Sequence, residues 1–85
     1  MDVTILLGSS SDLPIAQKCT KILEHFDVPY QLRVASAHRS PKFVEQIVGD
    51  AIDDGCSVFI AMAGLAAALP GAVAALTTKP VIGVP

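Results

Sequence analysis

The chain has 85 residues, 52% of them hydrophobic and only 16% charged, which is typical of one small domain with a dense core and excludes a disordered chain. Six Lys and Arg against eight Asp and Glu give a net charge of −2 without a basic run, so a nucleic-acid partner is not expected. Cys19 and Cys56 lie far apart, with neither zinc-type spacing nor a disulfide framework, and the first residues lack the pattern of a signal peptide. These features favour a reducing, cytoplasmic setting.

The stretch from Ser57 to Thr78 contains no charged residue and approaches the length of a bilayer-spanning helix. However, Gly64 and Pro70-Gly71 interrupt it, and its β-prone first part gives way to an alanine-rich second part. We therefore expect a buried strand followed by a packed helix, and no membrane span.

The first predicted elements are a strand and a helix. The continuous apolar run from Val3 to Leu7, ended by Gly8, is typical of a strand covered on both faces. Asp12 is placed to cap a helix that has Pro14 in its first turn and stops at 27–29. One apolar stripe runs along this helix, formed by Ile15, Ala16, Cys19, Ile22, Leu23 and Phe26.

The rest of the chain continues the alternation. We expect strands at 30–35, 58–63 and 81–84, a second helix from Pro41, capped by Ser40, to 53–55, and a third helix from about Pro70 to Thr77. The stripe of the second helix consists of Phe43, Val44, Ile47, Val48, Ala51 and Ile52.

This βαβαβαβ pattern predicts an α/β fold with a parallel sheet, flavodoxin-like in three α/β/α layers, with strand order 2-1-3-4 and right-handed crossovers. Residues 1–85 then form a single domain in which the first helix lies alone on one face. Strands three and four would have one bare apolar side, so we expect an incomplete domain that is aggregation-prone, multimeric or marginally folded when isolated.

Three loops follow the first three strands and meet at the carboxyl edge of such a sheet, where ligands bind. In the first loop, at 8–12, Gly8 permits close approach, Ser9 and Ser11 offer hydroxyl groups, and a helix start favours phosphate. The alternative is a flexible serine turn with Asp12 as a structural cap. Neither a Walker loop nor a dinucleotide motif is present.

The second loop, at 36–41, contains adjacent residues suited to proton transfer and anion binding. His38 can titrate near neutrality, and Arg39 can grip a phosphate with two hydrogen bonds. Alternatively, His38 bonds a loop carbonyl and Arg39 is a solvated charge. The third loop, at 63–71, offers backbone amides and an apolar wall, or is simply tightly packed. His25 is expected at the surface, and no metal-ligand spacing occurs.

Together, Gly8-Ser9-Ser10-Ser11-Asp12, Ser36-Ala37-His38-Arg39-Ser40-Pro41, the 63–71 loop and 79–85 resemble the N5-carboxyaminoimidazole ribonucleotide mutase family of purine biosynthesis, also known as the phosphoribosylaminoimidazole carboxylase catalytic subunit family. The resemblance covers essentially the whole chain, and since family members are about twice as long, it implies that the C-terminal part is missing. Arg39, where the carboxylase class usually has lysine, favours the mutase class.

The resemblance also implies roles for individual residues. Phosphate contacts match Ser9, Ser11, Ser36 and Arg39; the ribose-hydroxyl ligand matches Asp12; contacts around the imidazole match Ala37, Gly64 and Leu69; and the catalytic histidine matches His38. It further implies a ribonucleotide substrate and CO2, no metal, ATP or organic cofactor, and a homo-octamer.

One departure concerns Ala68, which stands where the family commonly has a histidine. Alanine cannot exchange a proton or form a hydrogen bond to a carboxylate, so turnover, the positioning of the carboxylate or the reaction itself is expected to differ here. The alternatives are direct carboxylation of aminoimidazole ribonucleotide by CO2, a related pyridinium-mononucleotide carboxylase, and a non-catalytic ribonucleotide-binding or assembly module.

Overall fold

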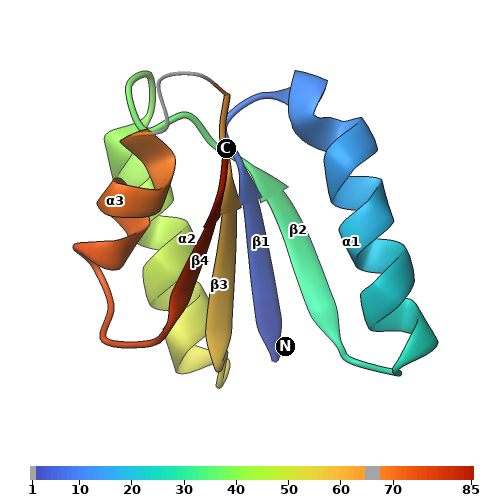
Figure 1. Ribbon diagram of the computed structural model, residues 1–85. Coiled ribbons are helices and arrows are strands. Elements are labelled where there is room, and N and C mark those ends of the chain that lie inside the picture. The colour runs from blue at the N-terminus through green and yellow to red at the C-terminus, as the bar shows by residue number, and fades with distance from the viewer. Residues whose placement is uncertain (1, 65–67) are drawn as a thin grey trace.

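The computed structural model describes residues 2–64 and 68–85, so Leu65, Ala66 and Ala67 of the third loop lie outside the described residues. Its strands and helices alternate along the chain (Figure 1): β1 (Val3–Leu7), the short 3-10 helix η1 (Ser10–Asp12), α1 (Leu13–His25), β2 (Tyr30–Val34), α2 (Pro41–Asp53), β3 (Val58–Met62), α3 (Ala68–Ala74) and β4 (Val81–Val84). The four strands pair in parallel in the order β2-β1-β3-β4, so the predicted fold class and strand order are confirmed.

The helices form layers on both faces of the sheet: α1 lies on one face, and α2 with α3 on the other (Figure 1). Every residue of β1 is buried, because side chains alternate between the two faces and both are covered. The core under α2 and α3 includes Leu6, Phe59 and Val73, whereas the smaller core under α1 includes Ile5 and Leu7. Because the strands are parallel, their carboxyl ends all lie at one edge of the sheet. The loops with the candidate site residues begin at this edge.

The apolar stripe of the first helix is buried less than its pattern predicts. Ala16 is the buried residue of α1, whereas Ile15, Ile22 and Phe26 are 48%, 60% and 69% exposed. The reason is that α1 is the sole described helix on its face (Figure 1) and packs mainly on β1, so just the centre of its stripe meets the sheet. On the other face, α2 buries Val44, Ile47, Val48 and Ala51.

Several boundaries differ from the prediction. The strands β2 and β3 end one residue earlier, and α3 runs from Ala68 to Ala74 rather than from Pro70 to Thr77. Pro70 falls within the first turn of α3, where a missing N–H breaks no helical hydrogen bond. After α3, Thr77 Oγ1 accepts a hydrogen bond from the Lys79 N–H at 3.0 Å, and the chain turns into β4. No helix within residues 2–64 and 68–85 combines the length and apolar character needed to span a bilayer.

The predicted caps are also corrected. Asp12 precedes α1 as expected, but its backbone is helical (φ −83°, ψ −5°) and its side chain makes no capping hydrogen bond. Instead, the extended Ser9 caps η1, since its Oγ accepts from the Ser11 N–H at 3.3 Å. Ser40 likewise precedes α2 without a side-chain cap. The Asp12 carboxylate is therefore not used to begin α1.

Candidate functional site

A hollow of about 260 Å³ opens at the carboxyl edge of the sheet, between the loops that follow β1, β2 and β3. Apart from Arg39, every residue that the sequence marked for the site lines it. Its lining consists of Gly8, Ser9, Ser11, Asp12, Ser36, Ala37, His38, Ala63, Gly64, Ala68 and Leu69. This is the edge of an open parallel sheet where ligands bind, with β1 flanked by β2 and β3.

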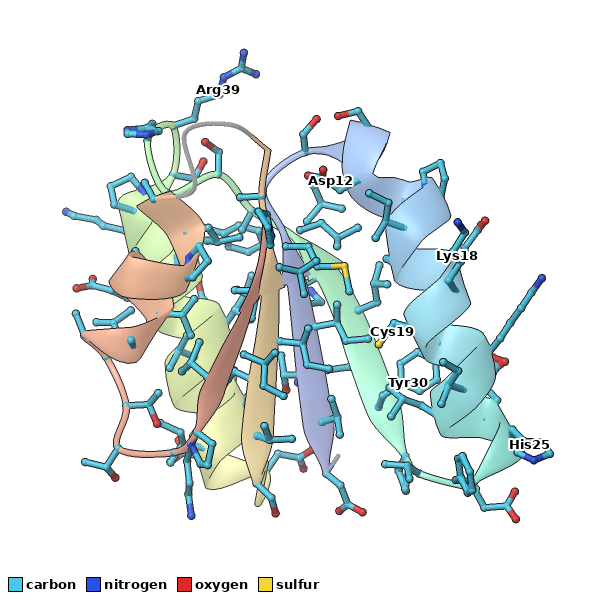
Figure 2. All side chains as sticks on the ribbon, in the orientation of Figure 1. Asp12, Lys18, Cys19, His25, Tyr30 and Arg39 are labelled. Atoms are coloured by element: carbon cyan, nitrogen blue, oxygen red, sulfur yellow. The ribbon has the colours of Figure 1, made fainter. Side chains whose placement is uncertain are left out.

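Arg39 lines a second, adjoining hollow of about 580 Å³. Gly8, Ser9 and Ser36 border both hollows, so the two share one wall. Figure 2 shows the Arg39 side chain extending beyond the carboxyl edge and away from the sheet, while Asp12 lies at the start of α1. The structure therefore places Arg39 beside the first hollow and not inside it.

In the first loop, two serine hydroxyls are bonded to each other. The Ser11 hydroxyl donates to Ser9 Oγ at 3.0 Å, and the Ser11 N–H donates to the same oxygen. Ser9 Oγ accepts both bonds and donates none to another described residue. Its hydroxyl hydrogen is therefore free to be donated to a ligand. Of the structural alternative, the Asp12 cap is not formed, since this side chain makes no capping hydrogen bond.

Gly8 joins this loop to the end of β3. Its N–H donates to the Met62 carbonyl at 2.9 Å, which continues the pairing of β1 with β3. A Cβ on Gly8 would lie 3.5 Å from Ala63 Cβ, an ordinary contact, so the packing does not require glycine here. Close approach of a ligand remains a reason for glycine at the hollow.

Ser36 organises the second loop through two hydrogen bonds. Its Oγ accepts from the Arg39 N–H at 3.2 Å, and its carbonyl accepts from the Ser40 N–H at 2.9 Å. This turn presents His38 at the hollow with an exposed side chain. Among the described residues, the imidazole makes no hydrogen bond to a loop carbonyl, in contrast to the structural alternative.

The third loop and the start of α3 supply an apolar wall of Ala63, Gly64, Ala68 and Leu69. Leu69 is buried and also belongs to the core under α2 and α3, so it holds this wall against the sheet. Sequence reasoning connected Gly8 with close approach of a ligand and Ala68 with the family's histidine position, but it did not single out Ala63, which also lines the hollow. The position of Ala63 directly after β3 was the available signal.

The hollow combines two kinds of surface. One side has hydroxyls, the Asp12 carboxylate and the His38 imidazole, and the other is apolar and made of small side chains. Such a site has polar groups suited to an anionic ligand and a wall suited to a flat ring, and its imidazole is a side chain that can take up and release a proton. Among the described residues, no group of three or more His, Cys, Asp or Glu is placed to hold a metal ion.

The strand order and the layers of helices define a flavodoxin-like α/β domain, with a hollow at the carboxyl edge of its sheet. The family model described as AIR carboxylase matches residues 2–85, and the chain belongs to this family. Over 83 residues, 98% of this chain, it is 59% identical to the N5-carboxyaminoimidazole ribonucleotide mutase of Methanocaldococcus jannaschii. It is 58% identical to the probable N5-carboxyaminoimidazole ribonucleotide mutase of Methanobrevibacter smithii over an equal share.

Two solved crystal structures are also similar to this chain in fold and sequence. The crystal structure of Treponema denticola PurE matches 95% of this chain with a TM-score of 0.87 and 34% identity. A crystal structure of a substituted form of the Treponema denticola enzyme matches the same share with a TM-score of 0.91 and 30% identity. The chain spans 52% of each of these chains, 51% of the M. jannaschii protein and 24% of the M. smithii protein.

Proposed function

We propose that this chain acts in de novo purine biosynthesis, in the conversion of N5-carboxyaminoimidazole ribonucleotide to 4-carboxyaminoimidazole ribonucleotide. The observation that carries the proposal is the convergence of the three family-like loops on one hollow at the carboxyl edge. The names of two relatives at 58% and 59% identity support the same reaction.

The ribonucleotide phosphate is assigned to the shared wall of the two hollows. Ser9 and Ser36 border both, Ser11 is bonded to Ser9, and Arg39 lines the second hollow beside this wall. Hydroxyl donors and a guanidinium together suit a phosphate dianion. Asp12, which makes no capping bond, accepts a hydrogen bond from a ribose hydroxyl.

The imidazole ring of the ribonucleotide substrate lies against the apolar wall, with contacts to Ala37, Gly64 and Leu69. In the reaction, the bond between the exocyclic nitrogen and the carboxylate breaks, CO2 is released into the hollow, and the nitrogen takes up a proton. The ring carbon then bonds CO2 and gives up its own proton. His38 is the proton carrier, because an imidazole both accepts and donates near neutral pH.

The test is conversion of the N-carboxylated ribonucleotide by the 85-residue chain, followed by absorbance of the product, with His38→Asn as the matched variant. We expect His38→Asn to lose turnover by at least a hundredfold while aminoimidazole ribonucleotide still raises its melting temperature. Loss of ligand binding together with turnover would instead make His38 structural.

Two other functions are each favoured by one observation. A relative in Candida glabrata, 48% identical, is named phosphoribosylaminoimidazole carboxylase, which favours direct carboxylation. Incorporation of labelled bicarbonate without the N-carboxylated substrate would establish that reaction. Ala68 favours a binding module without catalysis, because it removes a proton carrier from the apolar wall. Saturable binding without turnover would establish this function.

Ala68→His tests directly whether the missing histidine at this position limits turnover. Because Ala68 lines the hollow, an imidazole at this position would face the bound ligand and supply a second proton carrier. We expect turnover to rise at least tenfold in the mutase assay, whereas the same substitution at the exposed Ala74, outside the hollow, should change nothing. Turnover by the unmodified chain that Ala68→His does not raise would show that the chain works without a second histidine, whereas no turnover in either form would favour the binding module. A cytoplasmic location and a homo-oligomeric assembly remain predictions.

A further inference from the structure

The first turn of α3 forms part of the apolar wall of the hollow. The first two residues of this helix, Ala68 and Leu69, both line the hollow. The helix packs on β3 and β4, and Figure 1 shows it on the opposite face of the sheet from α1. The position of the wall therefore depends on how closely α3 approaches these two strands.

Two small residues allow α3 to approach the sheet closely. Ala61 of β3 and Gly83 of β4 are paired in register, and Ala61 is fully buried in the core under α2 and α3. Gly83 faces the same core, since paired residues of a sheet point to one face. A Cβ on Gly83 would lie 3.1 Å from Cβ and 3.3 Å from Cγ of Pro70, which is closer than an ordinary contact. The φ of Gly83 is not positive, so packing against Pro70, and not the backbone conformation, requires glycine here.

Pro70 connects this contact to the wall of the hollow. It follows Leu69 directly in the first turn of α3, and its ring is rigid. A methyl group on Gly83 would require Pro70 to move by a few tenths of an ångström. Ala68 and Leu69 would move with Pro70, because the residues of one helical turn keep their relative positions.

We propose that Gly83 is a positioning residue of the candidate site. It lets Pro70 lie against β4 and thereby holds Ala68 and Leu69 where they contact the imidazole ring of the substrate. Gly83 is not among the residues that line the hollow, so it acts through Pro70. The inference rests on the proposed function, because that function places the imidazole ring against this wall.

A shift of α3 should affect the ring of the substrate and not its phosphate. The phosphate is assigned to Ser9 and Ser36, which belong to the loops after β1 and β2. Each of these loops has its own internal hydrogen bonds, since Ser9 is bonded to Ser11 and Ser36 to the Arg39 N–H. The two parts of the ribonucleotide therefore report separately on the two walls.

The probes are aminoimidazole ribonucleotide and ribose 5-phosphate, which has the ribose and the phosphate but no imidazole ring. Isothermal titration calorimetry gives both dissociation constants for the 85-residue chain and for Gly83→Ala. Because small displacements of positioning groups weaken contacts strongly, we expect Gly83→Ala to bind aminoimidazole ribonucleotide about three- to tenfold more weakly. Its affinity for ribose 5-phosphate should stay within about twofold.

Pro70→Gly tests the same contact from the side of the helix. It removes the ring atoms that support α3 on β4 and adds no atom, so it serves even if Gly83→Ala does not fold. We expect a weaker affinity for aminoimidazole ribonucleotide, again without an effect on ribose 5-phosphate. In the double variant the new methyl group fills part of the space that Pro70 leaves, so the affinity should return toward that of the unmodified chain.

Leu23→Ala is the control for a general loss of stability. Leu23 packs against the core under α1, on the other face of the sheet. The substitution should lower the melting temperature but leave the ratio of the two dissociation constants unchanged. Folding of every variant is checked by circular dichroism at the temperature of the titrations.

Amide NMR signals of the unliganded chain separate this inference from the proposed function. The signals of Ala68 and Leu69 should shift in Pro70→Gly and in Gly83→Ala and return in the double variant. This measurement involves no ribonucleotide, so it still applies if the unmodified chain does not bind aminoimidazole ribonucleotide, a result that would contradict the proposed function. Unchanged signals, or equal losses of affinity for both probes, would overturn the positioning role of Gly83.

Discussion

At the level of single residues, Ser36 connects the loop backbone to the site. Its Oγ accepts the Arg39 N–H at 3.2 Å and its carbonyl accepts the Ser40 N–H at 2.9 Å, so one residue closes the turn that carries His38. Its side chain also lines both hollows. The residue therefore positions His38 and Arg39 and also contributes a hydroxyl to the proposed phosphate site.

We predict that Ser36→Ala weakens binding of aminoimidazole ribonucleotide by about two- to twelvefold, since a lost hydrogen bond of this kind costs about 0.5–1.5 kcal/mol. The measurement is the dissociation constant by isothermal titration calorimetry. Ser36→Thr, which keeps the hydroxyl, should restore most of the affinity. Ser57→Ala, at an exposed serine outside both hollows, should have no effect. Equal affinity in Ser36→Ala and the unmodified chain would contradict this role.

At the level of elements, Tyr30 ties the start of β2 to the last turns of α1. Its hydroxyl donates to Glu24 Oε1 at 2.9 Å, and this hydrogen bond, more than burial, raises the pKa of Tyr30 above its ordinary value. The bond needs the protonated phenol. Its stabilisation is therefore fully present below the ordinary tyrosine pKa and is lost as the pH rises through the raised one.

A spectrophotometric titration of Tyr30, the single tyrosine of the chain, checks this. We expect its midpoint above that of a free tyrosine, and Glu24→Gln should move it back toward the ordinary value. A midpoint that does not respond to Glu24→Gln would show that the hydrogen bond is not formed in solution.

The packing of α3 on β4 depends on Gly83. A Cβ at this position would lie 3.1 Å from Cβ and 3.3 Å from Cγ of Pro70, whose rigid ring cannot easily move. We predict that Gly83→Ala destabilises the chain by about 1–3 kcal/mol in urea unfolding. As a control, Gly49 lies inside α2 with nothing within 4 Å of its Cβ position, so Gly49→Ala should stabilise by about 0.5–1 kcal/mol. Equal effects would contradict the proposed contact.

The elements were predictable where the pattern reflects local physics. The apolar runs of β1 and β3 and the prolines near the helix starts fixed the order of elements, and the loops after the strands fixed the place of the site. Features set by tertiary packing were not predictable. The exposure of Ile22 and Phe26 depends on how much of the sheet α1 covers, and the position of Arg39 beside the hollow depends on the turn at Ser36.

At the level of the whole molecule, stability comes unequally from the two faces of the sheet. The core under α2 and α3 contains the largest fully buried side chain, Phe59, with Ile47, Val48 and Val73 around the same cluster. On the face under α1, Ile82 of β4 and the α1 side chains Ile15, Ile22 and Phe26 remain exposed to solvent. A chain of this size has a free energy of unfolding of about 4–13 kcal/mol, and a half-covered face places it toward the lower end.

We therefore predict that Phe59→Ala unfolds most of the isolated chain, because removing a fully buried phenylalanine costs about 3–5 kcal/mol. Phe26→Ala removes the same atoms from a side chain that is 69% exposed, so it should cost less than about 1 kcal/mol. Urea unfolding followed by circular dichroism, with sedimentation velocity on the same samples, measures stability and association together. If both substitutions cost the same, the core under α2 and α3 would not be the main source of stability. If Phe26→Ala instead converted a multimer to a monomer, the exposed flank of α1 would hold copies of the chain together.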